Sequence, residues 1–236
     1  MQKEEILNKI HGGLIVSCQA LEDEPLHSSI IMSRMANAAK IGGAVGIRAN
    51  TVEDILEIRK MVELPIIGII KRDYSDSEIY ISPTLKEIQE LIDSPAEIIA
   101  LDATLRRRPK NEKIESSIEA IKKAGKIAMA DISTYEEGIE AYKKGFDIIS
   151  TTLSGYTPYS PQIENPDYEL IKKLSRDVNI PVIAEGRVFY PEQLIKCFGC
   201  GAYCVVVGAA ITRPQTITKH FVRAINEYKM VKSDCK

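Results

Sequence analysis

The chain has 236 residues, 31 of them basic and 33 acidic, and its formal net charge at neutral pH is −2. This balance argues against a general binder of nucleic acid or other polyanions. No apolar run approaches the roughly 18 residues that span a membrane, and the charged start MQKEEILNKI lacks the apolar region of a secretory signal. The five cysteines, including Cys235, form no disulfide framework, so we expect a reducing, cytoplasmic setting.

Eight short apolar segments recur along the chain, and each runs into a polar residue and then a helix-like stretch. They begin about 21 to 34 residues apart, the length of one β-strand and one helical return. They are rich in Ile and Val without alternating polarity, as parallel strands buried on both faces require. The expected strands are 14–18, 43–48, 65–71, 97–102, 126–131, 147–152, 181–186 and 204–208.

Segments with helical periodicity lie between these strands. Thr51 is an expected N-cap, Pro83 is expected near a first helical position, and Gly125 and Gly145 are expected to end two helices. The tail 230–236 matches no motif, and disorder there is compatible with its sequence. The expected helices are 51–63, 82–93, 111–125, 133–145, 165–179, 190–199 and 213–229.

Eight βα units predict an α/β protein with a single (β/α)8 TIM barrel. Closure removes the two edges that an open doubly wound sheet, the alternative, would leave. No Gly/Ser/Pro-rich linker interrupts the chain, so residues 1–236 are expected to form one domain. In such barrels the carboxyl ends of the strands carry the active site.

Lys71 ends the third predicted strand and Glu185 ends the seventh, so the two lie well apart around the barrel. Burial and the neighbouring Arg48 would lower the pKa of Lys71, which suits it to proton abstraction or Schiff-base formation. Two titratable groups on opposite walls can remove a proton from one face of a carbon and return it to the other. The structural alternatives are ion pairs, of Lys71 with Asp73 or Asp102 and of Glu185 with Arg187.

Small residues follow the seventh and eighth strands, where barrels often bind phosphate through backbone N–H groups. Gly186, Gly208 and Ala209 would let the backbone approach a phosphate, and Arg213 would supply a bidentate fork. The alternative for Gly208 is a tight turn alone. These residues predict a barrel of the phosphate-binding type.

Polar residues end four further strands and are candidates for substrate binding: Gln19, Arg48, Asp131 and Thr152. Closing hydrogen bonds at the barrel end is their structural alternative. The long loop 154–167 is expected to be a lid or a wall of the substrate site. The basic run 106–110 is expected to be a solvated loop, and contact of one of its arginines with the site is the alternative. The cysteines Cys197, Cys200 and Cys204 are expected to be buried free thiols, since no fourth metal ligand lies nearby.

Several runs, taken together and in order, resemble one family. They are GGLIVSCQA, GIRAN, IIGIIKRDY, IIALDATLRRRP, MADIST, STTLSGYT, IAEGR and VVVGAAITRP, and they span Gly12 to about Ala224. The family is that of the N-acylglucosamine-6-phosphate 2-epimerases, also called N-acetylmannosamine-6-phosphate 2-epimerases.

The resemblance implies interconversion of N-acetylmannosamine 6-phosphate and N-acetylglucosamine 6-phosphate in bacterial sialic acid breakdown, without metal or organic cofactor. Lys71 and Glu185 would be the acid/base pair, and the sequence leaves open which takes the proton in each direction. Gln19, Arg48 and Asp131 would hold the sugar, and Gly186, Gly208 and Arg213 the phosphate. The resemblance also implies a homodimer in which the last helix packs against the partner barrel.

Three other functions remain to be weighed. A Schiff-base lyase would use Lys71 as nucleophile. A synthase acting on indole or thiazole phosphates has little support from a chain with 6% aromatic residues and no Trp. A non-catalytic phosphosugar-binding barrel would not need a lysine and a glutamate at opposed strand ends.

Overall fold

The computed structural model describes residues 2–233, in which eight parallel strands close into a barrel in chain order. Every strand pairs with its neighbours in sequence, and β1 also pairs with β8, which confirms the predicted (β/α)8 barrel. The strands are β1 (Leu14–Cys18), β2 (Gly46–Asn50), β3 (Ile66–Ile69), β4 (Ile98–Asp102), β5 (Ile127–Asp131), β6 (Ile148–Ser150), β7 (Val182–Glu185) and β8 (Cys204–Val207).

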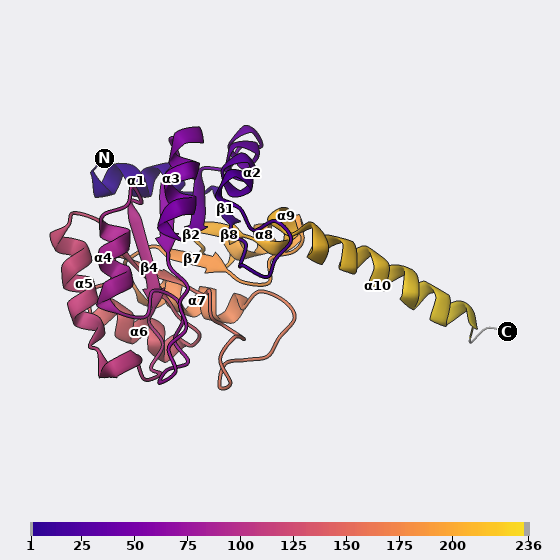
Figure 1. Cartoon of the computed structure of the whole chain (residues 1–236). Coiled ribbons are helices and arrows are strands. Elements are labelled where there is room, and N and C mark those ends of the chain that lie inside the picture. The colour runs from indigo at the N-terminus through magenta and orange to yellow at the C-terminus, as the bar shows by residue number, and fades with distance from the viewer. Residues whose placement is uncertain (1, 234–236) are drawn as a thin grey trace.

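Helices surround the barrel, except that the last helix projects away from it as a long arm (Figure 1). None of the helices within residues 2–233 is long and apolar enough to cross a membrane. The helices are α1 (Lys3–Ile10), α2 (Ser29–Ile41), α3 (Val52–Met61), α4 (Leu85–Ile92), η1 (Pro109–Asn111), α5 (Ile114–Lys123), α6 (Tyr135–Lys143), α7 (Tyr168–Asp177), α8 (Pro191–Gly199), α9 (Ala209–Thr212) and α10 (Pro214–Ser233).

Helix boundaries differ from the sequence-based expectation at several points. Thr51 caps α3 as expected, but α4 begins at Leu85 with Thr84 as its N-cap, so Pro83 precedes the helix instead of opening it. The sequence did not specify α1, α2 or α9. Helix α10 continues to Ser233, into the tail for which disorder was considered, and residues 234–236, including Cys235, lie outside the described part.

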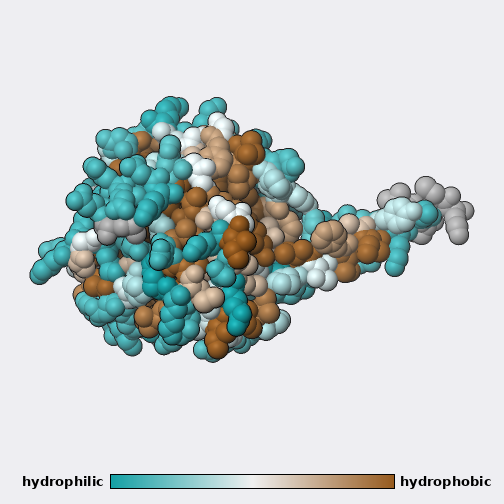
Figure 2. Space-filling model, turned by 90° about the horizontal axis from the view of Figure 1, so that it is seen from above, coloured by the Kyte–Doolittle hydropathy of each residue, from teal (hydrophilic) through white to brown (hydrophobic). Residues whose placement is uncertain are grey.

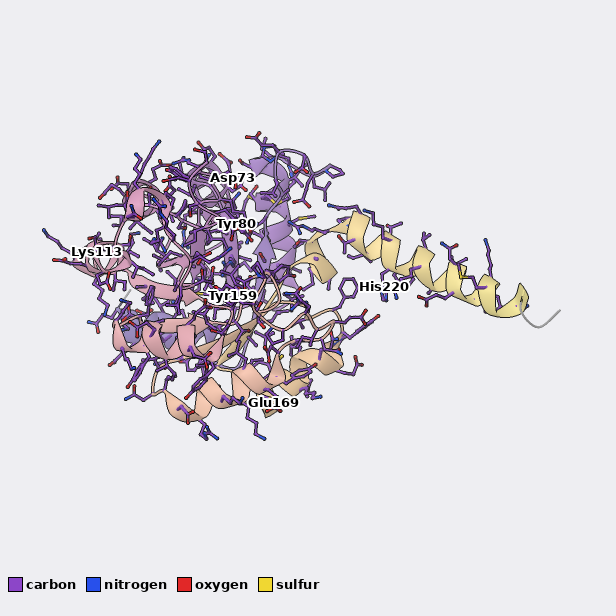
Figure 3. The ribbon with its side chains drawn as sticks, turned by 90° about the horizontal axis from the view of Figure 1, so that it is seen from below. Asp73, Tyr80, Lys113, Tyr159, Glu169 and His220 are labelled. Carbon is purple, nitrogen blue, oxygen red and sulfur yellow. The ribbon has the colours of Figure 1, made fainter. Side chains whose placement is uncertain are left out.

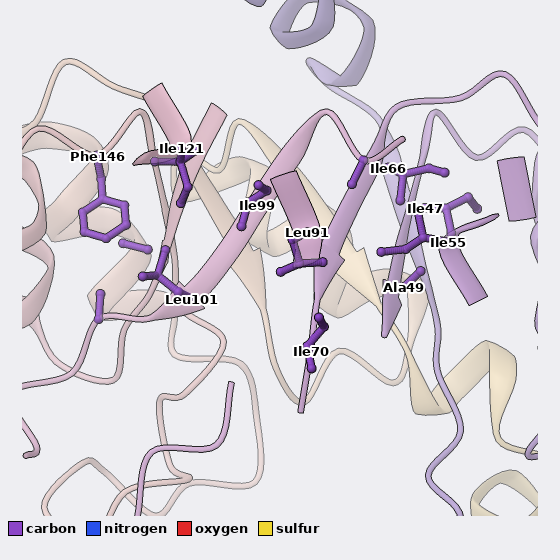
Figure 4. Packing of buried hydrophobic residues seen from close by; sticks show 14 of the residues in the cluster. Ile47, Ala49, Ile55, Ile66, Ile70, Leu91, Ile99, Leu101, Ile121 and Phe146 are labelled. Atoms are coloured by element: carbon purple, nitrogen blue, oxygen red, sulfur yellow. The ribbon is translucent and has the colours of Figure 1, made fainter. Parts of the chain in front are cut away.

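The apolar core has two layers, separated by the wall of the barrel. Side chains of the outer layer, including Ile47 and Ile66, pack between the strands and the surrounding helices (Figure 4). Side chains of the inner layer, including Ile67 and Ile69, fill the barrel. Full burial of one such side chain contributes about 1.5–3 kcal/mol relative to leaving it in water. The inner layer fills the barrel with apolar side chains, and the polar residues lie beyond it at the carboxyl ends of the strands.

Candidate active site

The two-residue alternation of the strands explains why the polar strand ends meet inside the barrel. Ile67 and Ile69 of β3 belong to the inner layer, so Lys71 continues the same face at the strand's end. On β7, Ile183 is an inner residue, and Glu185 follows two positions later. Strands β3 and β7 are four strands apart in a barrel of eight. Lys71 and Glu185 therefore approach the barrel mouth from opposite walls.

These residues line a cavity of about 370 Å³ at the carboxyl ends of the strands. Asp131 is fully buried and does not line the cavity. The predicted residues that do so are Gln19, Arg48, Lys71, Thr152, Glu185, Gly186, Gly208, Ala209 and Arg213. Sequence reasoning missed other lining residues, among them Ser17, Tyr80, Phe189, Thr212 and Thr216. Ser17 was detectable as the inward polar position of β1, whereas Tyr80 and Phe189 lie in loops that carry no periodic signal.

A buried guanidinium organises the charges beneath the cavity. Arg48 is 1% exposed, and its Nη2 lies 2.5 Å from Oδ2 of Asp131 while its Nη1 donates to Oε2 of Glu185 at 2.8 Å. Burial alone would lower the pKa of Arg48, but the carboxylates of Asp131 and Glu185 raise it above its ordinary value. Thr152 donates through Oγ1 to Oδ1 of Asp131 at 2.7 Å. Arg48 and Asp131 are thus partners of each other, and Arg48 alone of the two reaches the cavity.

Lys71 carries a perturbed ammonium group. Burial is the main cause that lowers its pKa to about 8, and the positive charges of Arg48 and Arg213 add to the effect. Within residues 2–233 no carboxylate forms an ion pair with Lys71, and Asp102 instead pairs with Arg106 at 2.6 Å. The structural alternative of an ion pair with Asp73 or Asp102 is therefore not realised. A lysine with this pKa is partly neutral near physiological pH and can accept a proton.

Glu185 is perturbed in the opposite direction. The pKa of its carboxyl is raised to about 7, chiefly by burial and also by the negative charge of Asp131, against the opposing effect of Arg48. The expected alternative partner, Arg187, lies elsewhere: its Nη1 donates to the carbonyl of Ser154 at 2.6 Å. The basic partner of Glu185 is therefore Arg48 and not Arg187. The carboxyl can exist in either protonation state close to neutral pH.

The segment after β8 provides a compact turn beside β1. Gly208 lies so close to β1 that an added Cβ would be 3.3 Å from Cβ of Ser17. Thr212 donates through Oγ1 to the carbonyl of Ser17 at 2.8 Å, which fixes α9 against β1. The N–H groups of Ile211 and Thr212 both donate to the carbonyl of Gly208, at 2.8 and 2.9 Å, which closes the turn. Gly208, Ala209 and Arg213 all line the cavity, and phosphate binding by this segment stays a prediction.

One wall of the cavity comes from the loop after β6. Tyr156 lines the cavity, and the guanidinium of Arg187 lies 4.9 Å from the centre of its ring. Further along the loop, Tyr159 donates to Glu137 on α6 at 2.7 Å. Figure 3 labels Tyr159 among the loops on this side of the barrel. The expectation that loop 154–167 walls the substrate site agrees with the position of Tyr156.

The basic run after β4 is more structural than expected. Arg107 is exposed, but Arg108 is buried and donates to the carbonyl oxygens of Asp102 and Ser82. Arg106 holds the carboxylate of Asp102. A solvated loop was therefore the wrong expectation for two of the three arginines, because the chain here uses them to satisfy buried oxygens. None of the three lines the cavity.

The cysteines near the end of the barrel are free thiols. Cys197 and Cys204 are buried, and burial raises the pKa of both thiols above its ordinary value. Across the described residues 2–233, no three His, Cys, Asp or Glu side chains converge as metal ligands would. Cys200 is partly exposed and is also free. The spacing of these cysteines therefore reflects packing around α8 and β8.

Comparison with known proteins identifies close relatives. Residues 32–227 match the model of a family described as "Putative N-acetylmannosamine-6-phosphate epimerase". Two proteins named "Putative N-acetylmannosamine-6-phosphate 2-epimerase" are similar over most of their length. The one from Clostridium perfringens strain SM101 is 62% identical, covering 92% of this chain and 98% of the relative. The one from Clostridioides difficile strain 630 is 59% identical, covering 93% of this chain and 99% of the relative.

A solved structure is also similar to this chain. It is that of the N-acetylmannosamine-6-phosphate 2-epimerase from Clostridium perfringens, which superposes with a TM-score of 0.93 at 59% identity, covering 95% of this chain and 98% of that one.

Proposed function

This chain belongs to the N-acetylmannosamine-6-phosphate epimerase family, and on that basis we propose that Lys71 and Glu185 are its proton-transfer groups. The enzyme interconverts N-acetylmannosamine 6-phosphate and N-acetylglucosamine 6-phosphate at C2, a reaction of amino sugar and sialic acid catabolism. The observation that carries the assignment is the opposed placement of Lys71 and Glu185 in one cavity, with pKa values of about 8 and about 7.

The chemistry requires two groups on opposite faces of one carbon. In the open-chain sugar C2 lies next to the C1 aldehyde, so its proton is acidic enough for a side-chain base. One of Lys71 and Glu185 removes this proton, and the other returns a proton to the opposite face. The cationic Arg48 stabilises the enolate that forms between the two steps. Because Arg48 is held by Asp131, it does not need to reorganise when the negative charge develops.

The remaining predicted residues would hold the substrate on either side of C2. Gln19 and Thr152 line the cavity and offer hydrogen-bonding groups to hydroxyls or the amide. The backbone around Gly186, Gly208 and Ala209 would receive the phosphate together with Arg213. Phosphate binding remote from C2 provides energy that places this carbon between the two proton-transfer groups. No cofactor takes part in the proposed steps.

The assignment is tested by proton NMR of N-acetylmannosamine 6-phosphate with the enzyme in D2O. Deuterium should appear at C2 as the gluco epimer accumulates, and it should be absent with enzyme in which Lys71 is replaced by Ala. Epimer that retains all of its C2 proton would contradict exchange through two solvent-accessible side chains. A covalent adduct trapped by borohydride would instead favour the Schiff-base lyase.

A homodimer built around α10 is part of the same proposal. Helix α10 extends away from the barrel (Figure 1), and apolar atoms gather along it and at its base (Figure 2). Phe221, Ile225 and Tyr228 recur at the spacing of one helix face and are 66%, 52% and 60% exposed. At its base His220, labelled in Figure 3, packs on Phe189 of the cavity with ring centroids 5.0 Å apart. An exposed apolar face of this kind is suited to a second copy of the chain.

Domain organisation and location complete the proposal. The closed barrel uses strands from residue 14 to residue 207, which supports one domain across residues 1–236. The four cysteines among the described residues are free, as in a reducing compartment. We therefore place the enzyme in the cytoplasm, where its phosphorylated substrate would be found.

A further inference from the structure

Arg213, the predicted phosphate ligand, is held by a carboxylate from a distant part of the chain. Its Nε lies 2.9 Å from Oε1 of Glu24, and its Nη2 donates to Oε2 of the same residue at 2.9 Å. Glu24 belongs to the loop that follows β1, 189 residues before Arg213 in sequence. The contact therefore joins the loop after β1 to the segment after β8.

The pairing uses a particular edge of the guanidinium. An arginine has five N–H donors, and a carboxylate that binds Nε and Nη2 occupies one side edge of the group. The N–H donors of the other edge, on Nη1 and Nη2, are not used by this carboxylate. No hydrogen bond to Nη1 of Arg213 occurs within residues 2–233. Since Arg213 lines the cavity, this edge can bind two oxygens of a phosphate while Glu24 keeps the other edge.

Glu24 is itself firmly placed. The N–H of Leu21 donates to Oε2 of Glu24 at 2.9 Å, and Nε2 of Gln215 donates to Oε1 at 3.0 Å. The carboxylate side chain is only 16% exposed. A phosphate that displaced Glu24 would break both of these hydrogen bonds together with the ion pair to Arg213. Glu24 is therefore suited to remain in place when the substrate binds.

We propose that Glu24 is a positioning residue for the substrate phosphate, fixing Arg213 by its Nε–Nη2 edge so that the Nη1–Nη2 edge receives the phosphate. This inference rests on the proposed role of Arg213 in phosphate binding. Ordering an arginine side chain costs rotamer freedom. With Glu24 in place, this cost is met before the substrate arrives. The loop after β1 thus contributes to affinity without touching the substrate.

Steady-state kinetics of Glu24→Gln tests the proposal, because the substitution keeps the side-chain shape and removes the paired charge. We expect the KM for N-acetylmannosamine 6-phosphate to rise about tenfold with kcat within about twofold, as for loss of binding shared by ground and transition state. Glu22→Gln is the matched control, since it removes the same charge from an exposed position of the same loop. It should behave as wild type.

A double-mutant cycle with Arg213→Ala separates this inference from the proposed function. If Arg213→Ala leaves KM unchanged, the phosphate assignment itself fails. If Arg213→Ala raises KM and Glu24→Gln does not, only the role of Glu24 fails, and a lower KM in Glu24→Gln would make Glu24 a competitor of the phosphate. If Glu24 acts through Arg213, Glu24→Gln should have no further effect in the Arg213→Ala background.

A measurement on the unaltered protein covers the case in which Glu24→Gln does not fold. The Nε–H signal of Arg213 in an NMR spectrum, assigned by its loss in Arg213→Lys, should be slow to exchange in the free enzyme. It should remain so when N-acetylglucosamine 6-phosphate is added, while the Nη signals change. Loss of the Nε–H signal on binding would mean that Glu24 is displaced, and the proposal would be wrong.

Discussion

Arg48 of β2 and Glu185 of β7 are joined across the interior of the barrel by a hydrogen bond of 2.8 Å between Nη1 and Oε2. The same guanidinium holds Asp131 of β5, so one buried cation is shared by two carboxylates. Glu185 is therefore subject to burial, an attracting cation and a repelling anion together. Its protonation near neutral pH reflects the balance among these three, and this balance can be tested.

The pH dependence of kcat/KM should be bell-shaped, with its acidic limb near pH 7 and its basic limb near pH 8. A transfer between Lys71 and Glu185 requires that the pair hold one proton. Below the Glu185 pKa of about 7 both groups are protonated and no base remains, and above the Lys71 pKa of about 8 both have lost their protons and no acid remains. Initial rates of kcat/KM across pH 5–10 in both reaction directions measure this. A profile that is flat from pH 6 to 9 would contradict it.

Asp131→Asn should move the acidic limb of this profile to lower pH. The charge of Asp131 disfavours ionised Glu185, and the substitution also leaves Arg48 to interact more strongly with Glu185 alone, so both effects lower the Glu185 pKa. Because Asp131 is a fully buried partner of Arg48, stability should also fall, by about 1–3 kcal/mol. The pH–rate profile and urea unfolding report the two effects. Asp23→Asn, at an exposed position, is the control for both.

Lys71→Ala should abolish epimerisation and leave binding of the phosphosugar within about tenfold, since Lys71 acts on C2 while Arg213 and the backbone after β8 are proposed to hold the phosphate. Calorimetry with N-acetylglucosamine 6-phosphate measures binding, and NMR in D2O measures turnover and exchange at C2. Lys86→Ala removes an exposed lysine of α4 and should leave both unchanged. Turnover at the wild-type rate in Lys71→Ala would remove Lys71 from the mechanism.

The barrel and most of the cavity could be predicted because both follow from short-range patterns. A run such as 65–71 is apolar throughout and ends in Lys71, and strand alternation then places that lysine inside the barrel mouth. The eight repeats fix the strand order, and strand order places β3 opposite β7. The placement of Lys71 and Glu185 on opposite sides of the barrel mouth follows from this strand order alone.

The contacts between side chains could not be predicted in the same way. Sequence position offered Arg187 as the neighbour of Glu185, but Arg187 adopts a left-handed backbone conformation with φ +57° and its side chain holds the loop after β6 instead. The carboxylate that fixes Arg213 lies in a loop without periodicity, so Glu24 carried no signal. Such pairings depend on which loops meet at the barrel mouth, and neither spacing nor composition records this.

Helix α10 provides a prediction about assembly. Phe221→Glu with Ile225→Glu should convert the proposed homodimer into monomers, because it places two charges on the exposed apolar face. Sedimentation velocity at micromolar concentration measures the change. Lys219→Glu lies about 160° around the helix from Phe221 and should leave the dimer intact. A monomeric wild-type enzyme would contradict the homodimer itself.

Gly68→Ala should destabilise the barrel where β3 meets the helices. A Cβ at this position would lie 2.9 Å from Cβ of Ala96, closer than real Cβ atoms approach, and 3.0 Å from Cδ1 of Ile55 and Cδ2 of Leu91, tighter than most Cβ contacts. Figure 4 shows Ile55 and Leu91 packed against this part of the sheet. The free energy of unfolding, measured in urea, should fall by about 1–3 kcal/mol.

The matched control for this substitution is Gly199→Ala at the end of α8. An added Cβ there meets nothing within 4 Å, and the backbone does not adopt a positive φ. Alanine should therefore stabilise the protein by about 0.4–1 kcal/mol, chiefly by restricting the unfolded chain. If Gly68→Ala were as stable as Gly199→Ala, β3 would have to shift by several tenths of an ångström without cost. Lys71 follows Gly68 by three residues, so such a shift would appear as a change in kcat, and unchanged kcat with unchanged stability would refute the close packing described here.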